Sequence, residues 1–486
     1  MNQSARVLLS LLIVGTQLAT DAQGAVNLPD LGNAAGTAIS PSQERKLGEE
    51  FMRRARSALT IIEDSEITEY VRSLGRQLLA SAASGAPDFY FFVVDDPSVN
   101  AFAVPGGFVG IHTGLISTAQ TEAELASVVA HEITHVTQRH IPRLIAEQEK
   151  ASLPAMAAIL ASILLAGSGK QGGEAGVALT TAAMAQRGIN FTRSFEEEAD
   201  RIGMDLLTSA EFDPHGMPAF FERMQAANRH NETNLPEYLR THPITTNRIA
   251  DARARADRAT GNIRPDSSEF HHVRAKLRAY AKRPAPEIVR GFQDNLAQGK
   301  YRDADAERYG YALALLRAKQ LEQARNELQK LSKRHPGRLN YRMAQAEVEM
   351  AADRRTEALA IYQAAHRERP SSVVLMREYS QALLRTGRPA EARDLLKTAL
   401  RSDRDDPLLY KLMAEAAGAA GARAEAHQAQ AEYYYLMGSP AAAVEQLRIA
   451  SRYAGDNFYL QASLEARIAA IREESGLGED RSPARK

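Results

Sequence analysis

The stretch TEAELASVVAHEITHVTQRH, residues 121–140, says most about the fold of this 486-residue chain. Thr121, with Glu124 three residues later, forms a capping-box pattern that predicts a helix beginning near Glu122. Pro142 is expected to stop that helix after His140. The apolar residues cover most of its faces, so the helix should be buried: Leu125, Val128, Val129, Ile133 and Val136.

Two histidines in the middle of this helix have the spacing of a metal site. His131 and His135 are four residues apart, so their imidazoles point to the same side, about 40° from each other. Neutral imidazole is a good zinc ligand, and Glu132 stands beside the pair. A carboxylate in that place can take a proton from water as the water attacks a peptide carbonyl. The motif predicts a zinc peptidase with Glu132 as general base.

A third protein ligand is expected from a second helix. The metzincin pattern would require a histidine at position 141, but the residue is Ile141. Ser194, with Glu197, caps a predicted helix that runs to about Ser209. Glu196 and Asp200 share one face of this helix.

Gly203 lies on the same face and would let the two helices approach closely. We therefore predict Glu196 as the third zinc ligand, with Asp200 accepting the outer N–H of a ligating histidine. Glu197 and Glu198 fit a solvated helix start.

The segments around the first metal helix predict a small sheet. Residues 88–94 (DFYFFVV) and 107–111 (GFVGI) have the composition of strands, and Pro105-Gly106-Gly107 marks a tight turn between short extended segments. Helical and strand-like segments mix up to a division near residues 262–268. The expected fold class is α+β, mostly helical with a small sheet, for a metallopeptidase domain of residues 25–262.

The C-terminal half has a 34-residue period. Small residues recur at two points of each unit, and Pro336 and Pro370 mark the ends of two units. This pattern is the tetratricopeptide signature, and it predicts an all-α solenoid over residues 268–475 that binds peptides or partner proteins. The recurring residues are Ala312, Ala346, Ser380 and Ala414 at one point, and Ala324, Ala358, Ala392 and Ala426 at the other.

Composition and termini limit the functional class. The formal net charge is zero, which does not favour nucleic acid as a partner, and the absence of cysteine excludes disulfides and thiolate metal sites. Arg6, the apolar run Val7–Val14 and the small residues up to Gly24 predict a signal peptide over residues 1–24, with a membrane anchor as the alternative. Residues 476–486 are expected to be a disordered tail.

These motifs carry a resemblance to a known family. His131–His135, the Glu196 and Asp200 pair, and residues 100–107 (NAFAVPGG) resemble the zinc metallopeptidase family of the CAAX prenyl proteases. The appended repeats make the chain similar to the periplasmic branch of that family, the β-barrel assembly-enhancing proteases. The resemblance implies a gluzincin-like fold, one Zn²⁺ per chain, a periplasmic location, Glu132 as general base, Glu196 as ligand and Asp200 as a catalytic proton donor.

The same branch implies a regulatory histidine and a set of partners. His242, before Pro243, would be a fourth zinc ligand that holds the enzyme latent, the alternative being a surface histidine. Arg248 would stabilise an oxyanion or form a plain salt bridge. The implied substrates are unfolded or stalled proteins, with outer-membrane β-barrel proteins and their assembly machinery as partners.

Two further interpretations stay open at this point. Residues 153–185 form a buried helical hairpin or a mobile lid that touches substrate or the membrane surface. The whole chain is an active endopeptidase, or alternatively a repeat-based chaperone or scaffold with a vestigial protease domain. The other histidines without a partner at metal spacing are expected at the surface or in turns: His112, His140, His215, His230, His271 and His272.

Overall fold

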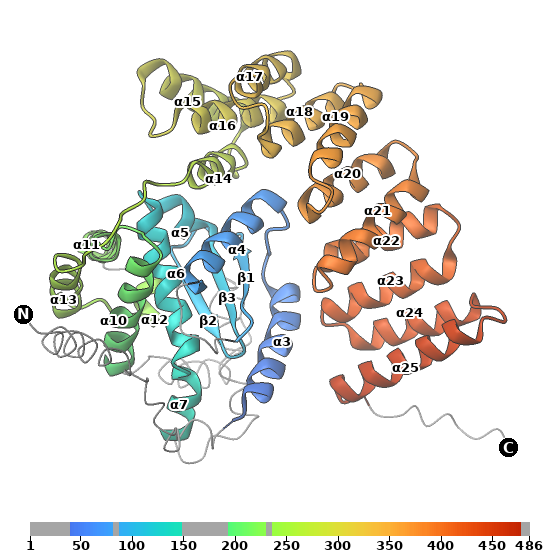
Figure 1. Cartoon of the computed structure of the whole chain (residues 1–486), viewed down its shortest axis with the longest axis horizontal. Coiled ribbons are helices and arrows are strands. Elements are labelled where there is room, and N and C mark those ends of the chain that lie inside the picture. The colour runs from blue at the N-terminus through green and yellow to red at the C-terminus, as the bar shows by residue number, and fades with distance from the viewer. Residues whose placement is uncertain (1–38, 81–86, 148–192, 230–235, 478–486) are drawn as a thin grey trace, which may run out of the picture.

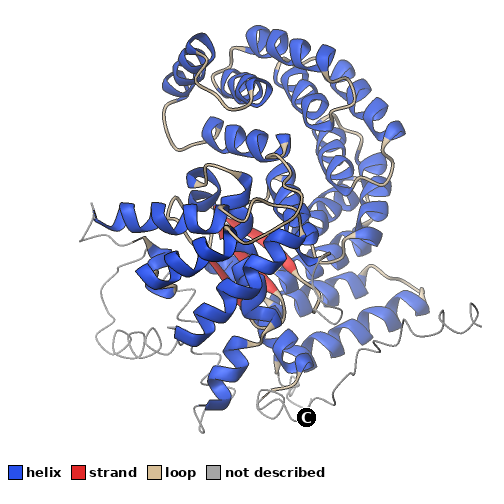
Figure 2. Cartoon of the chain, turned by 60° about the vertical axis from the view of Figure 1, so that its left-hand side comes forward, coloured by secondary structure: helices blue, strands red, loops and turns tan. Residues whose placement is uncertain are grey.

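The computed structural model describes residues 39–80, 87–147, 193–229 and 236–477. Helices surround a small sheet in the N-terminal part, and an array of helices follows and arcs around one side of that part (Figures 1 and 2). This α+β domain followed by an all-α array confirms the predicted fold class.

The sheet has three strands in the order β1-β3-β2. The strand β1 (Tyr90–Val94) pairs in parallel with β3 (Phe108–His112), and β2 (Ala101–Val104) pairs with β3 in the antiparallel sense. Aromatic and β-branched residues suit this central position, and every residue of β3 is buried. Gly106 and Gly107 have φ angles of 85° and 89°, so the predicted turn between β2 and β3 needs glycine.

The first metal helix forms as predicted at its start but not at its end. Helix α6 (Glu122–Thr137) begins where the Thr121 hydroxyl accepts the amide of Glu124. The prediction that Pro142 stops the helix after His140 is wrong. The chain turns at Arg139, which has a φ of 52°, and α7 (His140–Glu147) begins directly afterwards. Pro142 lies in the first turn of α7, where its missing N–H removes no helical hydrogen bond.

Helix α6 is central in the N-terminal part. It contacts strand β2 and four helices, α4 (Ser65–Leu79), α7, α10 (Arg193–Ser209) and α11 (Gly216–Arg229). Its side chains belong to one hydrophobic core that includes Leu125, Val129 and Ile133. The remaining helices of this part are α3 (Pro41–Ala58), α5 (Thr113–Thr118), α12 (Glu237–Thr241) and α13 (Thr246–Ala256).

The array consists of helices that pack against their neighbours along the chain. Among the residues with the 34-residue period, Ala324, Ala358 and Ala392 are fully buried, whereas Ala426 is half-buried. The helices are α14 (Ser268–Ala279), α15 (Ala285–Gln298), α16 (Ala304–Arg317), α17 (Leu321–Arg334), α18 (Leu339–Ala351), α19 (Arg355–Glu368), α20 (Val373–Arg385), α21 (Pro389–Ser402), α22 (Pro407–Ala419), α23 (Arg423–Leu436), α24 (Pro440–Arg452) and α25 (Phe458–Ser475).

The start of the array joins the N-terminal part through a buried polar junction. Lys276 Nζ on α14 lies 3.0 Å from Glu66 Oε2 on α4 and 2.7 Å from Asp64 Oδ2. The same Glu66 carboxylate accepts hydrogen bonds from Tyr309 Oη and Asn340 Nδ2, both at 2.7 Å. One carboxylate of the N-terminal part therefore holds three helices of the array.

The later helices of the array return to the N-terminal part. Arg56 on α3 donates to the carbonyl of Leu436 at 3.0 Å, and Arg72 on α4 lies 3.1 Å from Asp403. The arc is thus attached near both of its ends.

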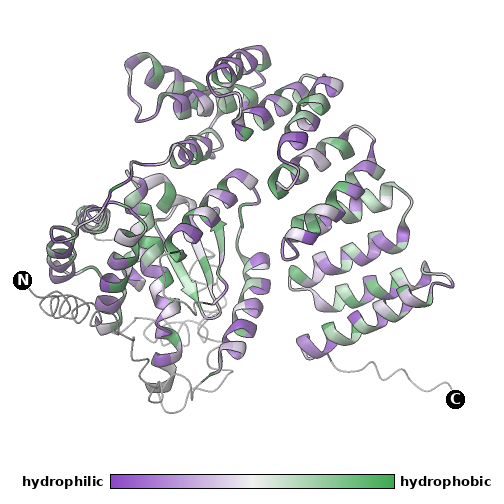
Figure 3. Ribbon diagram, viewed as in Figure 1, coloured by the Kyte–Doolittle hydropathy of each residue, from purple (hydrophilic) through white to green (hydrophobic). Residues whose placement is uncertain are grey.

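The strands are hydrophobic along much of their length, and the helices of the array carry both hydrophobic and hydrophilic residues (Figure 3). In the part of the chain that the structure describes, no helix combines the length and the apolar character needed to cross a membrane. The predicted signal peptide of residues 1–24, the segment 153–185 and residues 478–486 of the tail lie outside the described residues.

Candidate metal centre

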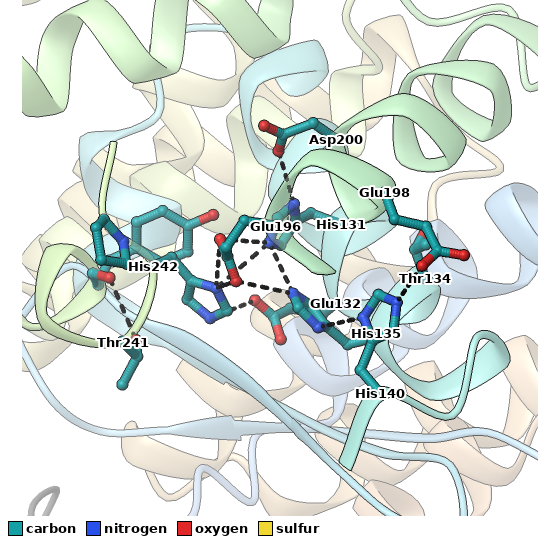
Figure 4. Close-up of polar contacts among 12 residues, drawn as sticks. His131, Glu132, Thr134, His135, His140, Glu196, Glu198, Asp200, Thr241 and His242 are labelled. Atoms are coloured by element: carbon teal, nitrogen blue, oxygen red, sulfur yellow. Dashed lines mark hydrogen bonds and ion pairs between the residues drawn. The ribbon is translucent and has the colours of Figure 1, made fainter. Parts of the chain in front are cut away.

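Helices α6 and α10 bring the predicted metal residues together. The two helices pack directly, and a Cβ added at Gly203 would lie 3.2 Å from the backbone nitrogen of His131. A side chain there would push the helices apart, which is the close approach predicted from the sequence. His131 and His135 face Glu196 across this contact (Figure 4).

Four buried side chains converge at one point. His131, His135, Glu196 and His242 each offer one ligand atom, and these atoms lie within 4.8 Å of one another. His131 Nε2 is 2.9 Å from His135 Nε2, and each lies 3.5 Å from a carboxylate oxygen of Glu196. His242 Nδ1 is 3.0 Å from Glu196 Oε1. Within the described ranges, this is the group of side chains that could hold a metal ion.

The register of the second helix distinguishes Glu196 from its neighbour. Glu196 is 2% exposed and faces the histidines, whereas the side chain of Glu197 is 57% exposed and pairs with Arg193. The side chain expected to ligate is therefore the one that points inward, and Glu197 is the solvated one.

The charges of the site suit a bound cation. Burial alone raises the pKa of Glu196, but His242 and His131 outweigh burial and hold that pKa well below its usual value. Burial lowers the pKa of His131, but Asp200 and Glu196 outweigh it and raise the pKa to about 9. Burial, with the nearby His131, keeps the pKa of His135 well below its usual range, so His135 is a neutral imidazole. The ionised Glu196 carboxylate beside the three imidazoles forms a donor set that fits a divalent metal such as zinc.

Asp200 lies behind His131, as the sequence predicted for a residue that orients a ligand. Its Oδ1 is 3.0 Å from His131 Nδ1, the nitrogen that faces away from Glu196. Burial raises the pKa of Asp200, but His131 and Arg248 outweigh burial and lower it. Asp200 is therefore ionised, and it can fix the ring orientation and tautomer of His131.

Arg248 forms the salt bridge that was one of its two predicted roles. Its guanidinium binds Asp200 in a bidentate manner, at 2.6 and 2.8 Å. Its Nη1 lies 2.9 Å from Glu196 Oε2 and donates to the carbonyl of Pro243 at 2.7 Å. With these contacts Arg248 holds three neighbours in place, and an oxyanion role stays a prediction.

Glu132 is placed beside the metal residues without being one of them. It is 1% exposed, and its Oε1 lies 3.4 Å from His242 Nε2. Burial raises the pKa of Glu132, while His242 and the backbone N–H of Ala103 on β2 lower it. A buried carboxylate with a raised pKa is suited to accept a proton near neutral pH.

His242 reaches the site from a short helix that the sequence did not predict. It is the C-cap of α12, its backbone N–H donates to the carbonyl of Tyr238, and it is 2% exposed. The Tyr238 ring stacks against its imidazole at 4.9 Å. His242 is therefore no surface histidine, and the interpretation as a latch keeps its geometric basis.

The prediction for His140 is wrong. His140 is fully buried, its Nδ1 lies 2.9 Å from the outer nitrogen Nδ1 of His135, and its Nε2 lies 3.3 Å from Glu198. On a continuous helix a residue five positions after His135 would be turned about 140° away. The break at Arg139 returns His140 to the metal side, and a histidine directly after a suspected helix end is the signal that could have identified it.

Two other histidines are also buried, contrary to prediction. His112 is 1% exposed and contacts Ser98, and His272 is 1% exposed and contacts Ser268 and Tyr341. His215 is exposed as predicted, and His230 lies outside the described residues.

Comparisons with known proteins agree with this arrangement. The family model of peptidase family M48 matches residues 65–256, and a tetratricopeptide repeat model matches residues 349–416. The chain is 34% identical over 466 residues to the β-barrel assembly-enhancing protease of Escherichia coli (strain K12), an alignment that covers 96% of this chain and 95% of that protein.

A Yersinia pestis protein with the same name is 34% identical over 475 residues, covering 96% of this chain and 97% of the relative. The mitochondrial metalloendopeptidase OMA1 of Arabidopsis thaliana is 34% identical over 151 residues, which cover 31% of this chain and 28% of that protein.

Proposed function

Because the chain belongs to the family of β-barrel assembly-enhancing proteases, we propose that it is a zinc-dependent endopeptidase of the bacterial periplasm that degrades misfolded or stalled outer-membrane proteins and assists β-barrel assembly. Membership of the family makes the chain a metalloendopeptidase. The observation that carries the proposal is the buried convergence of His131, His135 and Glu196, with Glu132 one residue from the first histidine.

In this proposal one zinc ion is held by His131, His135 and Glu196. When bound there, zinc supplies a Lewis acid that polarises a peptide carbonyl and makes water a better nucleophile. The outer nitrogen of His131 faces Asp200, and that of His135 faces His140, so each imidazole is oriented from behind.

Glu132 carries the proton transfer. Its buried carboxylate takes a proton from the attacking water and passes a proton to the leaving amine. The Ala103 N–H of β2 contributes to fixing the carboxylate. Arg248 keeps Asp200 and Glu196 in place through its salt bridges. The proton-donor role that the family resemblance implies for Asp200 is the alternative to its orienting role.

His242 would hold the enzyme latent. Its imidazole lies with the three other metal residues, and a catalytic zinc must keep one position open for water. With His242 as fourth ligand that position is filled until α12 moves. The resting enzyme is then closed, and binding of substrate or a partner shifts the equilibrium toward the open form.

The repeats would recruit substrate or assembly machinery. Solenoids of this kind present an extended concave surface, and the arc here is attached to the catalytic part near both ends. The similarity to β-barrel assembly-enhancing proteases supports outer-membrane β-barrel proteins as the substrate class. The alternative, a chaperone or scaffold with a vestigial site, has no support from the side chains that converge at the metal centre.

The test is digestion of an unfolded outer-membrane β-barrel protein. We expect zinc-dependent cleavage that a chelator stops. Glu132→Gln should bind zinc and lose activity by a factor of about 10² or more, since general-base catalysis contributes that much. Glu197→Gln, an exposed change on α10, is the matched control and should cleave normally. A Glu132→Gln enzyme that cleaves like wild type would favour the alternative, a chaperone or scaffold with a vestigial protease domain.

A further inference from the structure

The helix that carries His242 is fastened to the sheet at its other end. Glu237, the first residue of α12, accepts a hydrogen bond from the Ser98 hydroxyl at 3.1 Å. The backbone N–H of the next residue, Tyr238, donates to the carbonyl of Val99 at 3.1 Å. Both contacts come from the loop between β1 and β2.

Ser98 is itself held in place by His112 and Asp96. Its hydroxyl oxygen lies 2.9 Å from Nδ1 of His112, at the end of β3, and its backbone N–H donates to Asp96 Oδ1 at 2.7 Å. One hydroxyl has one proton, and the Glu237 carboxylate can only accept, so Ser98 donates to Glu237 and His112 Nδ1–H donates to Ser98. The result is a directed series of hydrogen bonds from His112 through Ser98 to Glu237, which begins at the end of the buried central strand β3.

Helix α12 connects the anchored residue Glu237 to His242 at the metal centre. It has five residues, and at its end the His242 N–H donates to the Tyr238 carbonyl at 2.8 Å while the two rings stack. The position of the His242 imidazole therefore follows the position of α12. On the far side Arg248 holds the carbonyl of Pro243, so the segment is tied down before and after His242.

We propose that Ser98 is the positioning residue that keeps the His242 latch closed, by fastening the start of α12 to the sheet. The inference rests on the proposed latent state and names the contact that maintains it. The same loop continues into β2, where the Ala103 N–H donates a hydrogen bond to Glu132. One segment therefore contacts both the general base and the latch.

Ser98→Ala removes the hydroxyl and with it the hydrogen bonds to His112 and Glu237. A hydrogen bond to a charged group is strong enough that its loss shifts the closed-to-open ratio by about tenfold or more. We expect unchanged zinc content, faster hydrogen exchange of the amides of Tyr238 and His242, and faster digestion, with the activity of His242→Ala as the ceiling. Ser98→Thr retains a hydroxyl and should behave like wild type.

The matched control is Ser65→Ala. Ser65 also donates to a glutamate, Glu378 Oε1 at 2.9 Å, but this hydrogen bond joins α4 to α20 and does not involve α12. This variant should leave exchange in residues 237–242 unchanged. Because both changes release the same latch, Ser98→Ala combined with His242→Ala should cleave no faster than His242→Ala alone.

The outcomes distinguish the Ser98 anchor from the His242 latch. If His242→Ala is activated but Ser98→Ala changes neither exchange nor activity, the anchor is wrong and the latch stands. If His242→Ala is not activated, the latch fails with it, whatever the exchange data show. If Ser98→Ala keeps its zinc and digests substrate more slowly, Ser98 supports the active state, and the proposal is overturned.

Discussion

Asp200 Oδ1 lies 3.0 Å from His131 Nδ1, while Nε2 of the same imidazole faces His135 and Glu196. The two nitrogens of one ring thus have different partners. Nε2 faces the metal residues, and Nδ1 faces a carboxylate that Arg248 holds in place. This relation joins helix α10 to helix α6 twice, through Glu196 and through Asp200.

Asp200→Asn should weaken zinc binding about 10- to 100-fold, because an amide no longer favours the ring orientation and tautomer of His131. A competitive chelator titration measures the change. Asp205→Asn, on the exposed side of the same helix, is the control and should bind zinc normally. Equal zinc affinity in both variants would mean that Asp200 does not orient the ligand.

Glu196→Gln should lose most of its bound zinc, whereas Glu197→Gln should keep about one zinc per chain. The physical reason is that Glu196 faces the histidines and Glu197 points to solvent. Metal analysis of the two purified variants decides this. The reverse result would place the third ligand one residue later on α10.

His242→Ala should retain zinc and digest unfolded protein faster than wild type, because it removes the group that competes with water for the open position. The gain is limited to the fraction of molecules that was closed. Steady-state cleavage measured together with zinc content tests it. A zinc-loaded variant that cleaves more slowly would falsify the latch and give His242 a role in the transition state.

Glu66→Ala should destabilise the attachment of the array. Burial lowers the pKa of Lys276, but Glu66 and Asp64 outweigh burial and hold it well above its usual value, so the lysine is charged. Asp64 stays beside Lys276 in this variant, so the change removes one charge-assisted contact and should cost about 1.5–3 kcal/mol in the free energy of unfolding.

Denaturant unfolding gives the measurement. Glu69→Ala is the control, because Glu69 pairs with Arg76 at the surface and should contribute less than about 1 kcal/mol. Similar losses for both variants would contradict a junction that depends on Glu66.

Mild acid should weaken the packing around His272. Burial, with Arg338, lowers the pKa of His272 below the value of 6.5 that it has when unfolded. The unfolded chain then binds more protons than the folded one, so this contribution to stability is complete above pH 6.5 and is lost as the pH falls toward the folded pKa. Below pH 6.5 the melting temperature of wild type should fall more steeply than that of His272→Asn. Parallel curves for the two proteins would show that His272 does not titrate in this way.

Local spacing determined a large part of this protein. Residues four apart on a helix share a face whatever surrounds them, so the pairs His131 with His135 and Glu196 with Asp200 could be placed from the sequence. The 34-residue period likewise requires neighbouring helix pairs to stack, and the small residues Ala324 and Ala358 are fully buried, as that packing requires.

Contacts between distant segments were decided by the tertiary structure alone. His140 was misplaced because the prediction assumed a continuous helix, and one residue with a positive φ angle, Arg139, turned it back to His135. Ser98 and Glu237, which share a hydrogen bond, are 139 residues apart in the sequence, and Lys276 and Glu66 are 210 residues apart. Such polar contacts leave no periodic pattern in the sequence, because a hydrogen bond needs only a donor and an acceptor that meet. The packing of the whole chain determines which donors and acceptors meet.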